Sequence, residues 1–316
     1  MSTPRVSIGI PLYNAERYLR FCLDGVAAQT YRDLEVVIAD NASTDRTGEI
    51  CREYASRDSR FRYVRNEKNL GAARNFNLVF ELSKGEYFRW AAYDDIMAPR
   101  AVEACAAALD ADPSLALAYP KTVIINEEGA EIERYDDDYV FADPDPARRF
   151  ARFLRVVDER NCNPLFGLMR RDLLARTMLL GSYHSADKVL LAQMVLLGRF
   201  AEVPEYLFYR RYHALGSVHV NRTARAFAAW FDTGRAGHMT FPRWRRLAEL
   251  LKSIGRSHLS VAQRARCTLS LIMFYMKPDK WKMLVASAAG NVVGLLSGKR
   301  MVHGKLSVPD QPARVK

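Results

Sequence analysis

Two carboxylates, Asp94 and Asp95, stand side by side directly after an apolar run, in the segment Trp90–Pro99. Adjacent carboxylates repel each other unless a cation neutralises them. A divalent metal ion with oxygen ligands, shared with substrate phosphates, is the natural partner. The pair cannot flank a glycosidic bond as a hydrolase pair does, because that needs carboxyl groups about 5–9.5 Å apart. An exposed acidic turn is the alternative interpretation.

Polar residues also follow the first two apolar runs of the chain. They are Pro11, Tyr13 and Asn14 after the first run, and Asp40, Asn41 and Asp45 after the second. A carboxylate such as Asp40 accepts hydrogen bonds from a base or a ribose, and Tyr13 offers a ring for stacking. Capping of the next helix by Ser43 or Thr44 is the alternative, but it leaves Asp40 unexplained.

Asn69 and Arg74 lie on either side of Gly71, at the predicted start of a helix. A helix N-terminus with a nearby cation is suited to bind an anion. The glycine pattern is not GxGxxG, and no GxxxxGK[ST] occurs, so the dinucleotide-binding and P-loop fingerprints are both missing. The alternative is a capped loop with a surface arginine.

Strand and helix patterns alternate through the first 125 residues. The predicted strands are Val6–Ile10, Leu34–Ala39, Phe61–Val64, Tyr87–Ala92 and Leu115–Ile125, and the predicted helices are Glu16–Ala28, Thr47–Ala55, Ala72–Leu82 and Arg100–Asp110. This order predicts an α/β fold with a mainly parallel sheet covered on both faces. Ligands bind at the carboxyl ends of such strands, where the polar residues above are found.

The second half differs from the first. Residues 127–145 are acidic and predict a loop or hairpin, and helical patterns return at Ala147–Val156 and Ser185–Leu197. Phe200–Tyr212 is strand-like, and the pattern beyond Asn221 is helical and basic.

Charge is divided unevenly along the 316 residues. Residues 1–180 carry a net charge of −4 and residues 181–316 carry +15. Residues 206–316 alone carry +16, with Trp244, Phe274 and Trp281 among the basic residues. Basic helices with aromatic anchors favour an anionic membrane surface. A basic helical cap over the core, or a dimerisation surface, is the alternative, and no nucleic-acid recognition motif is present.

The cysteines and the apolar runs bear on the compartment. Five scattered cysteines without a CxxC pair argue against a disulfide framework or a zinc site and favour a reducing compartment. We see no signal-peptide pattern, and the uncharged stretch Met283–Gly298 has 16 residues, short of the ~20 that a spanning helix needs. We therefore expect a cytoplasmic protein, peripheral at the cytoplasmic face of the membrane.

Three segments, in this order and spacing, carry a resemblance. VSIGIPLYNAERYLRFCLDGVAAQTYRDLEVVIADNASTDRT, NEKNLGAARNFN and YDDIMAP resemble the nucleotide-sugar glycosyltransferases of family 2, strongly over residues 5–125 and more loosely over 160–220. The resemblance implies a GT-A (Rossmann-like) fold and an inverting transfer that depends on Mg²⁺ or Mn²⁺. The nucleotide-sugar site that it implies consists of Pro11, Tyr13, Asn14, Asp40, Asn41, Asp45, Asn69, Arg74, Tyr93, Asp94 and Arg211.

The metal-binding motif departs from the family pattern. The family commonly shows DADD or DSDD where this chain has Ala92-Tyr93-Asp94-Asp95, which leaves Asp94 as the direct ligand with Asp95 assisting. Metal binding then depends more on the diphosphate and on a second protein ligand. His213 is the candidate, because residues 209–213 resemble the family's YRxH element near the donor diphosphate. An exposed basic strand end is the alternative.

The resemblance also implies a catalytic base at the start of a helix on the acceptor side. Family members often have Glu-Asp there, and this chain has Ala186-Asp187, so the base maps to Asp187. An inverting transfer needs one carboxylate that takes the proton of the acceptor hydroxyl. Helix capping by Ser185, with Asp187 in the first turn, is compatible with that role, and His184 is the second candidate.

Together these features predict a hexosyltransferase that uses a nucleotide-diphosphate sugar, expected to be a UDP-sugar. The expected acceptor is a hydroxyl of a glycolipid, a lipid-linked glycan or a surface polysaccharide. We expect a GT-A catalytic domain over 1–220, with a donor part (1–125) and an acceptor part (126–220), and a basic helical region over 221–316.

Two other functions stay open. Ala92 is the best argument for a non-catalytic relative that binds glycans or a membrane. A sugar-1-phosphate nucleotidyltransferase needs a glycine-rich basic loop after the first strand, and Pro11–Asn14 contains neither glycine nor a basic residue.

Overall fold

The computed structural model describes residues 3–214, 230–231 and 241–286. Every strand and helix predicted between residues 6 and 125 is present, with bounds that shift by one or two residues. The strands are β1 (Val6–Leu12), β2 (Leu34–Asp40), β3 (Phe61–Arg65), β4 (Tyr87–Trp90), β5 (Ile96–Met97), β6 (Leu115–Ile125), β7 (Glu131–Tyr135), β8 (Leu168–Arg170) and β9 (Arg199–Arg211). The helices are α1 (Glu16–Ala27), α2 (Thr47–Arg57), α3 (Ala72–Glu81), α4 (Ala101–Ala111), α5 (Pro146–Val156), α6 (Arg171–Ala175), α7 (Ala186–Leu197), α10 (Pro242–Arg256) and α11 (Val261–Tyr275), with a 3-10 turn, η1, at Asn163–Phe166.

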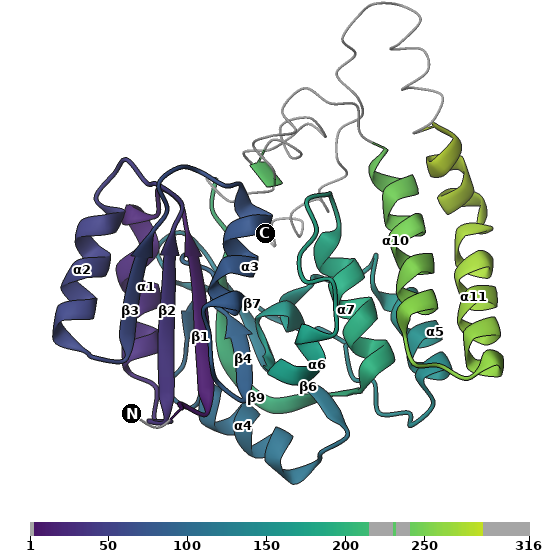
Figure 1. Cartoon of the computed structure of the whole chain (residues 1–316), viewed down its shortest axis with the longest axis horizontal. Coiled ribbons are helices and arrows are strands. Elements are labelled where there is room, and N and C mark those ends of the chain that lie inside the picture. The colour runs from purple at the N-terminus through teal and green to yellow at the C-terminus, as the bar shows by residue number, and fades with distance from the viewer. Residues whose placement is uncertain (1–2, 215–229, 232–240, 287–316) are drawn as a thin grey trace, which may run out of the picture.

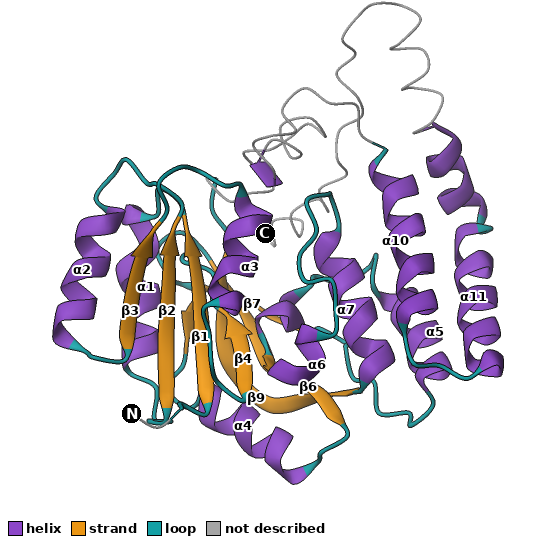
Figure 2. Ribbon diagram, in the orientation of Figure 1, coloured by secondary structure: helices purple, strands orange, loops and turns teal. Residues whose placement is uncertain are grey.

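The strands form one mixed sheet (Figure 2). Its order is β3-β2-β1-β4-β8-β6-β9-β5, and β7 pairs with β6 outside this path. β1 runs parallel to both β2 and β4, and β6 runs parallel to β9, whereas β8 is antiparallel to its neighbours. The register pairs Leu12 with Asp40, so the polar segments after β1 and β2 start side by side.

Helices cover both faces of the sheet, as the alternating pattern predicts (Figure 1). Val6, Ile8 and Ile10 of β1 belong to a buried cluster with residues of α1, α2 and α4. Val37 and Ala39 of β2 belong to the opposite cluster, with residues of α3, α5 and α7. Successive strand residues point to opposite faces, and burial on both faces explains why these strands are apolar throughout.

Two short strands, β5 and β8, are not predicted by the sequence pattern. β5 has two residues and β8 has three, too few to show a period. Both affect the site: β5 pairs with β9 through Ile96↔Tyr209 and so fixes the chain just after Asp95, and β8 joins β4 to β6. The acidic stretch forms a hairpin, since β7 is antiparallel to β6, and this confirms the predicted excursion.

The C-terminal helices pack onto α5 and α7. α10 lies against α7, and α11 lies against α5 and α10, at the outer end of the molecule (Figure 1). Asp158 joins these parts, because Lys188, Arg246 and Lys280 all contact its carboxylate at 2.6–2.9 Å. The predicted domain boundary at 220/221 lies outside the described residues. In the described part of the chain, no helix combines the length and the apolar character needed to span a bilayer.

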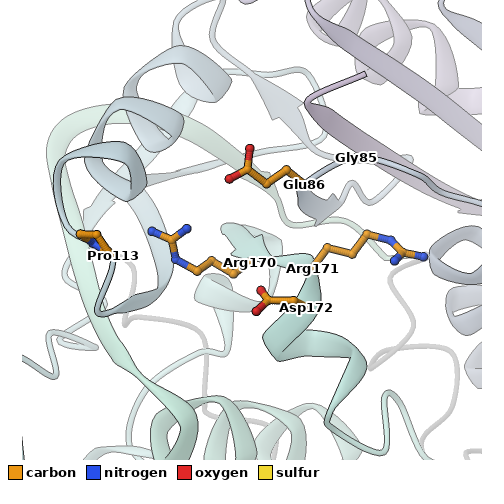
Figure 3. Close-up of a pocket in the computed structure, with 6 residues that line it drawn as sticks. All are labelled: Gly85, Glu86, Pro113, Arg170, Arg171 and Asp172. Atoms are coloured by element: carbon orange, nitrogen blue, oxygen red, sulfur yellow. The ribbon is translucent and has the colours of Figure 1, made fainter. Parts of the chain in front are cut away.

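A cavity of about 460 Å³ lies at the amino-terminal end of β4 (Figure 3). Gly85, Glu86 and Arg170 are among its lining residues. Arg170 already donates to the carbonyls of Leu109 and Leu115. The cavity is at the opposite end of the parallel strands from Asp94. Ligands of such sheets bind at the carboxyl ends of the strands, so this cavity is not at the ligand-binding edge.

Candidate active site

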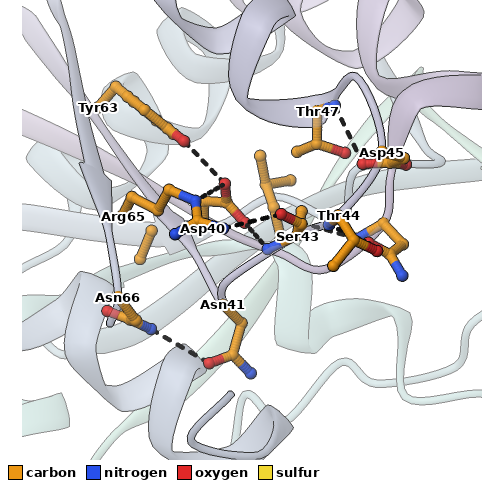
Figure 4. A network of polar contacts seen from close by, with 12 residues as sticks. Asp40, Asn41, Ser43, Thr44, Asp45, Thr47, Tyr63, Arg65 and Asn66 are labelled. Atoms are coloured by element: carbon orange, nitrogen blue, oxygen red, sulfur yellow. Dashed lines mark hydrogen bonds and ion pairs between the residues drawn. The ribbon is translucent and has the colours of Figure 1, made fainter. Parts of the chain in front are cut away.

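Asp40, the last residue of β2, organises the loop that follows it (Figure 4). Its side chain is fully buried, and its Oδ1 accepts a hydrogen bond from the backbone N–H of Ser43 at 2.8 Å. Its Oδ2 accepts from the hydroxyl of Tyr63 at 2.7 Å, with Nε of Arg65 3.7 Å away. Burial raises the pKa of Tyr63, and its hydrogen bond to Asp40 raises it further. The carboxylate therefore folds residues 41–45 back over the end of the strand.

The loops after β1 and β2 are tied together by side-chain amides and hydroxyls. Asn14 has a left-handed backbone (φ 48°), and its Oδ1 accepts from the N–H of Thr44 at 2.9 Å. Asp45 accepts from the N–H of Glu16. Asn41 donates to Oδ1 of Asn69 at 2.8 Å, which brings in the loop before α3.

The structure therefore brings the predicted residues Asn14, Asn41, Asp45 and Asn69 together. Tyr13 lies beside them with 45% of its surface exposed, as a stacking platform requires. Pro11 is buried within β1, just before the loop that carries Tyr13 and Asn14.

Asp94 and His213 form the second part of the site. Oδ2 of Asp94 lies 2.9 Å from Nε2 of His213, and the imidazole packs against the ring of Tyr18 with centroids 4.6 Å apart. Asp95 is buried and accepts from the backbone N–H of Arg211 at 2.9 Å. Burial and the neighbouring charge of Asp94 raise the pKa of Asp95 to about 8, against the opposing effect of Arg210. Burial also raises the pKa of Tyr93 beside this pair.

Arg211 and Arg210 have different surroundings, because consecutive strand residues point to opposite faces. The guanidinium of Arg211 is buried and donates to the carbonyls of Asp94, Asn126 and Glu127 at 3.1, 3.0 and 2.7 Å. Arg210 donates instead to Oδ1 of Asn163 and lies within electrostatic reach of both Asp94 and Asp95. Arg211 thus holds the backbone of the turn that carries Asp94, and Arg210 supplies positive charge near it.

A divalent ion fits the Asp94–His213 pair. Oδ2 of Asp94 and Nε2 of His213 are within hydrogen-bonding distance of each other, at 2.9 Å, and both are atoms that can ligate a divalent ion. Within the described ranges no group of three His, Cys, Asp or Glu side chains surrounds a common point. The protein thus offers two ligands, and the remaining positions suit phosphate oxygens and water.

Asp187 lies at the start of α7. Its Oδ1 accepts from the N–H of Lys188 at 2.8 Å, and Ser185, the N-cap residue, makes no side-chain capping bond, contrary to the capping interpretation. Burial lowers the pKa of His184, an effect that the nearby Asp187 opposes. Burial raises the pKa of the Cys162 thiol, and Asp187 raises it further. Asp187 is therefore close to Cys162, and Cys162 directly precedes Asn163, which binds Arg210. This places Asp187 on the Arg210 side of the site.

Arg74 is placed differently from the other predicted residues. Its exposed side chain runs along α3 and pairs with Glu81 at 2.6 Å. In this structure its guanidinium is therefore directed toward the end of its own helix rather than toward the loops that hold Asn41 and Asn69.

Some residues of the site were not predicted. Tyr63 and Asn163 hold Asp40 and Arg210, respectively, but neither belongs to a sequence motif. Asp137, in the acidic stretch, is fully buried and accepts from Thr122 and Asn163. Burial raises the pKa of Asp137 to about 6. For Arg210 a signal did exist, because it is adjacent to Arg211 and strand alternation sends the two side chains apart.

The mixed sheet carries two adjacent carboxylates and two polar loops at the carboxyl ends of its strands. This is the arrangement of a glycosyltransferase of the GT-A fold. The model of the family described as Glycosyl transferase family 2 matches residues 7–177, more than half of the chain. The chain therefore belongs to glycosyl transferase family 2. The matched range includes Asp40 and Asp94 and ends before Asp187 and His213.

Individual relatives agree with this assignment. The chain is 36% identical over 98 residues to glycosyltransferase GlyG of Streptococcus pneumoniae, a match that covers 31% of this chain and 33% of GlyG. Matches to the curated relatives cover a third or less of their length.

Solved structures show the same fold. S. aureus TarS 1–349, in complex with UDP-GlcNAc, is similar with a TM-score of 0.64 at 14% identity, over 92% of this chain and 81% of that one. The mannosyltransferase PcManGT of Pyrobaculum calidifontis, in complex with GDP-Man and Mn²⁺, has a TM-score of 0.50 at 19% identity, over 95% and 89% of the two chains.

Proposed function

We propose that this enzyme transfers a hexose from a nucleotide-diphosphate sugar to a hydroxyl of a glycolipid, a lipid-linked glycan or a surface polysaccharide, with inversion at the transferred carbon. The observation that carries the proposal is the convergence of two groups at one edge of the sheet. The Asp94–His213 pair comes from the ends of β4 and β9, and the polar loop of Asp40 follows β2. A UDP-sugar is the favoured donor, supported by the UDP-GlcNAc bound to the structurally similar TarS.

In this proposal the nucleotide lies over the loops after β1 and β2. Tyr13 stacks on the base, and Asn14, Asn41, Asp45 and Asn69 bind the ribose and base edges. Asp40 holds these loops in place, because both of its oxygens already accept hydrogen bonds from within the protein. Arg74 reaches the phosphates only after leaving Glu81.

Asp94 and His213 would hold Mg²⁺ or Mn²⁺ against the diphosphate, with Asp95 behind them. When bound, the ion stabilises the charge that develops on the leaving diphosphate. Arg210 adds positive charge on the same side, and Arg211 fixes the backbone of Asp94. Asp187 takes the proton of the acceptor hydroxyl as the new glycosidic bond forms and the bond to the diphosphate breaks on the opposite face.

A panel of UDP- and GDP-sugars, each with and without Mn²⁺, tests the donor. A ligand that binds the native state raises the melting temperature, and 100 times its Kd adds about 2.7 kcal/mol of stability. We expect a metal-dependent rise with a UDP-sugar, accompanied by slow release of UDP. Absence of a rise with every nucleotide sugar would overturn the proposal.

The alternative is a non-catalytic, glycosyltransferase-like binding protein. Ala92 favours this alternative, because it has no carboxylate to offer a metal ion. Its backbone carbonyl accepts a hydrogen bond from the N–H of Asp95 and so closes the turn. Binding of a nucleotide sugar without any release of nucleotide would decide for this alternative. The anomeric configuration of the product, determined by NMR, tests inversion.

A further inference from the structure

The outward face of α11 is mostly apolar, and the exposed cation on it, Arg266, pairs with Asp145 at 2.6 Å. We call the apolar part of this face the α11 stripe, and it consists of Ala262, Ala265, Leu269, Ile272, Met273 and Met276, all exposed. Apart from the adjacent pair Ile272 and Met273, these residues recur at steps of three and four, so they lie on one side of the helix and of its C-cap residue Met276. The side chains of Leu269, Ile272 and Met273 are 58%, 51% and 65% exposed.

The stripe takes no part in the packing of α11. The opposite face, with Cys267, Leu271, Phe274 and Tyr275, is buried against α5 and α10. A surface helix that packs on one side is normally polar on the other. Contiguous exposed apolar surface marks a site of interaction with a protein or a membrane. In Figure 1, α11 forms the outer end of the molecule, so the stripe is accessible.

Cations border the stripe. Lys277 and Lys282 are exposed just after α11, and Trp281 is 48% exposed beside them. Asp279 is the single acidic residue between 257 and 286, and it lies 3.7 Å from Lys280. The rim of the stripe is therefore positive.

We propose that the α11 stripe docks on an anionic membrane surface. Its apolar ridge enters the boundary between headgroups and acyl chains, and Lys277 and Lys282 contact anionic headgroups. A second copy of the chain is a poorer occupant, because a two-fold contact brings the same patch, with the same cations, against itself. The α11 stripe contains none of the proposed catalytic residues. Docking on a membrane would bring the enzyme to a lipid-linked acceptor.

The location corrects one sequence-based expectation. Phe274 was expected to anchor the protein in the interface, but only 6% of it is exposed, and its ring lies 5.9 Å from the guanidinium of Arg246 and 5.3 Å from Nζ of Lys280. Trp281, which was also expected as an anchor, is exposed, and Ile272 and Met273 are the exposed apolar residues beside Phe274.

Co-sedimentation of the full chain with vesicles tests the proposal. The vesicles contain phosphatidylcholine, with or without phosphatidylglycerol, and no sugar nucleotide is added, so the result is independent of the transfer reaction. We expect binding to the anionic vesicles at low salt, little binding to neutral ones, and release at high salt as charges are screened.

A matched pair of variants assigns the surface. Ile272 on the stripe and Ile132 on β7 are both 51% exposed, so Ile272→Glu and Ile132→Glu make the same chemical change at equal exposure. Ile272→Glu should weaken binding about fivefold or more, as should each of Lys277→Gln and Lys282→Gln. Ile132→Glu should bind as the unaltered protein does, and circular dichroism should show that all variants remain folded.

Three results would overturn the proposal. One is failure of the unaltered protein to bind anionic vesicles at low salt. Another is an equal loss of binding in Ile272→Glu and Ile132→Glu. The third is a dimer that dissociates in Ile272→Glu while no form binds vesicles, which would assign the stripe to a second copy.

Discussion

Nε of Arg211 donates a hydrogen bond to the backbone carbonyl of Asp94, 3.1 Å away. The same guanidinium bonds the carbonyls of Asn126 and Glu127 and lies about 5 Å from the rings of Tyr18 and Phe21. One buried side chain thus fixes the turn that carries Asp94.

Arg211→Met should destabilise the enzyme. It leaves three carbonyls without their donor, and an unsatisfied buried polar group costs about 1–3 kcal/mol. Denaturant titration measures the loss. Arg17→Met is the control, because Arg17 contacts Glu127 from an exposed position, where an ion pair is worth about 0–1 kcal/mol. Equal stability of the two variants would contradict a supporting role for Arg211.

Asp94→Asn should lower transfer by about 10²-fold or more, because it removes the carboxylate that the proposed ion needs. Its melting temperature should change little, since the side chain's one partner among the described residues is His213. Initial rates with Mn²⁺ and with chelator measure the effect. Near-normal turnover of the variant in chelator would reject the metal assignment.

Asp187→Asn should reduce transfer by about 10²–10⁴-fold, the usual contribution of a general base. Donor affinity, measured by calorimetry, should be nearly unchanged, because Asp187 acts on the acceptor. His184→Gln is the comparison variant, and a larger loss there would move the role to His184. Loss of donor binding in Asp187→Asn would instead place Asp187 in the donor site.

The donor half could be predicted from the sequence more fully than the acceptor half. β1, β2 and the helices between them are buried on both faces and leave continuous apolar runs, and their polar ends follow directly in the chain. The Asp94–His213 contact joins residues 119 positions apart, so only the family resemblance indicated it. The buried roles of Arg211 and Phe274 depend on tertiary packing, which a list of basic and aromatic residues does not reveal.

Asp158 should make stability depend on pH. Burial raises its pKa, but Arg246, Lys188 and Lys280 outweigh burial and hold the pKa well below its usual range. A carboxyl whose pKa is lowered by folding contributes stability above its unfolded pKa of about 3.9, and that contribution is lost as pH falls.

Asp158→Asn should therefore cost about 3 kcal/mol at neutral pH, as expected when one partner of a buried cluster is removed. The difference from the unaltered enzyme should shrink below about pH 4. Thermal unfolding across this range checks both statements. A difference that is constant with pH would mean that packing, rather than charge, links the C-terminal helices to the core.

Arg89→Met should raise the melting temperature. Arg89 on β4 is fully buried, and none of its three guanidinium nitrogens has a hydrogen-bond partner among the described residues. Burial lowers the pKa of Arg89, because an unpaired charge is poorly solvated in the core. A methionine fills similar space without that penalty. Calorimetry measures the change in melting temperature. A fall would show that the guanidinium of Arg89 makes a stabilising interaction.

The position of β9 sets a timetable for the newly made enzyme. β9 lies between β6 and β5 in the sheet and leads directly to His213, so a nascent chain holds Asp94 long before its partner exists. The 119 residues between them take about 6–24 s to synthesise at about 5–20 residues per second. During that interval one edge of β6 has no neighbour, and an open strand edge is prone to pair with other chains. The ribosome therefore delivers Asp94 and the loops after β1 and β2 well before His213.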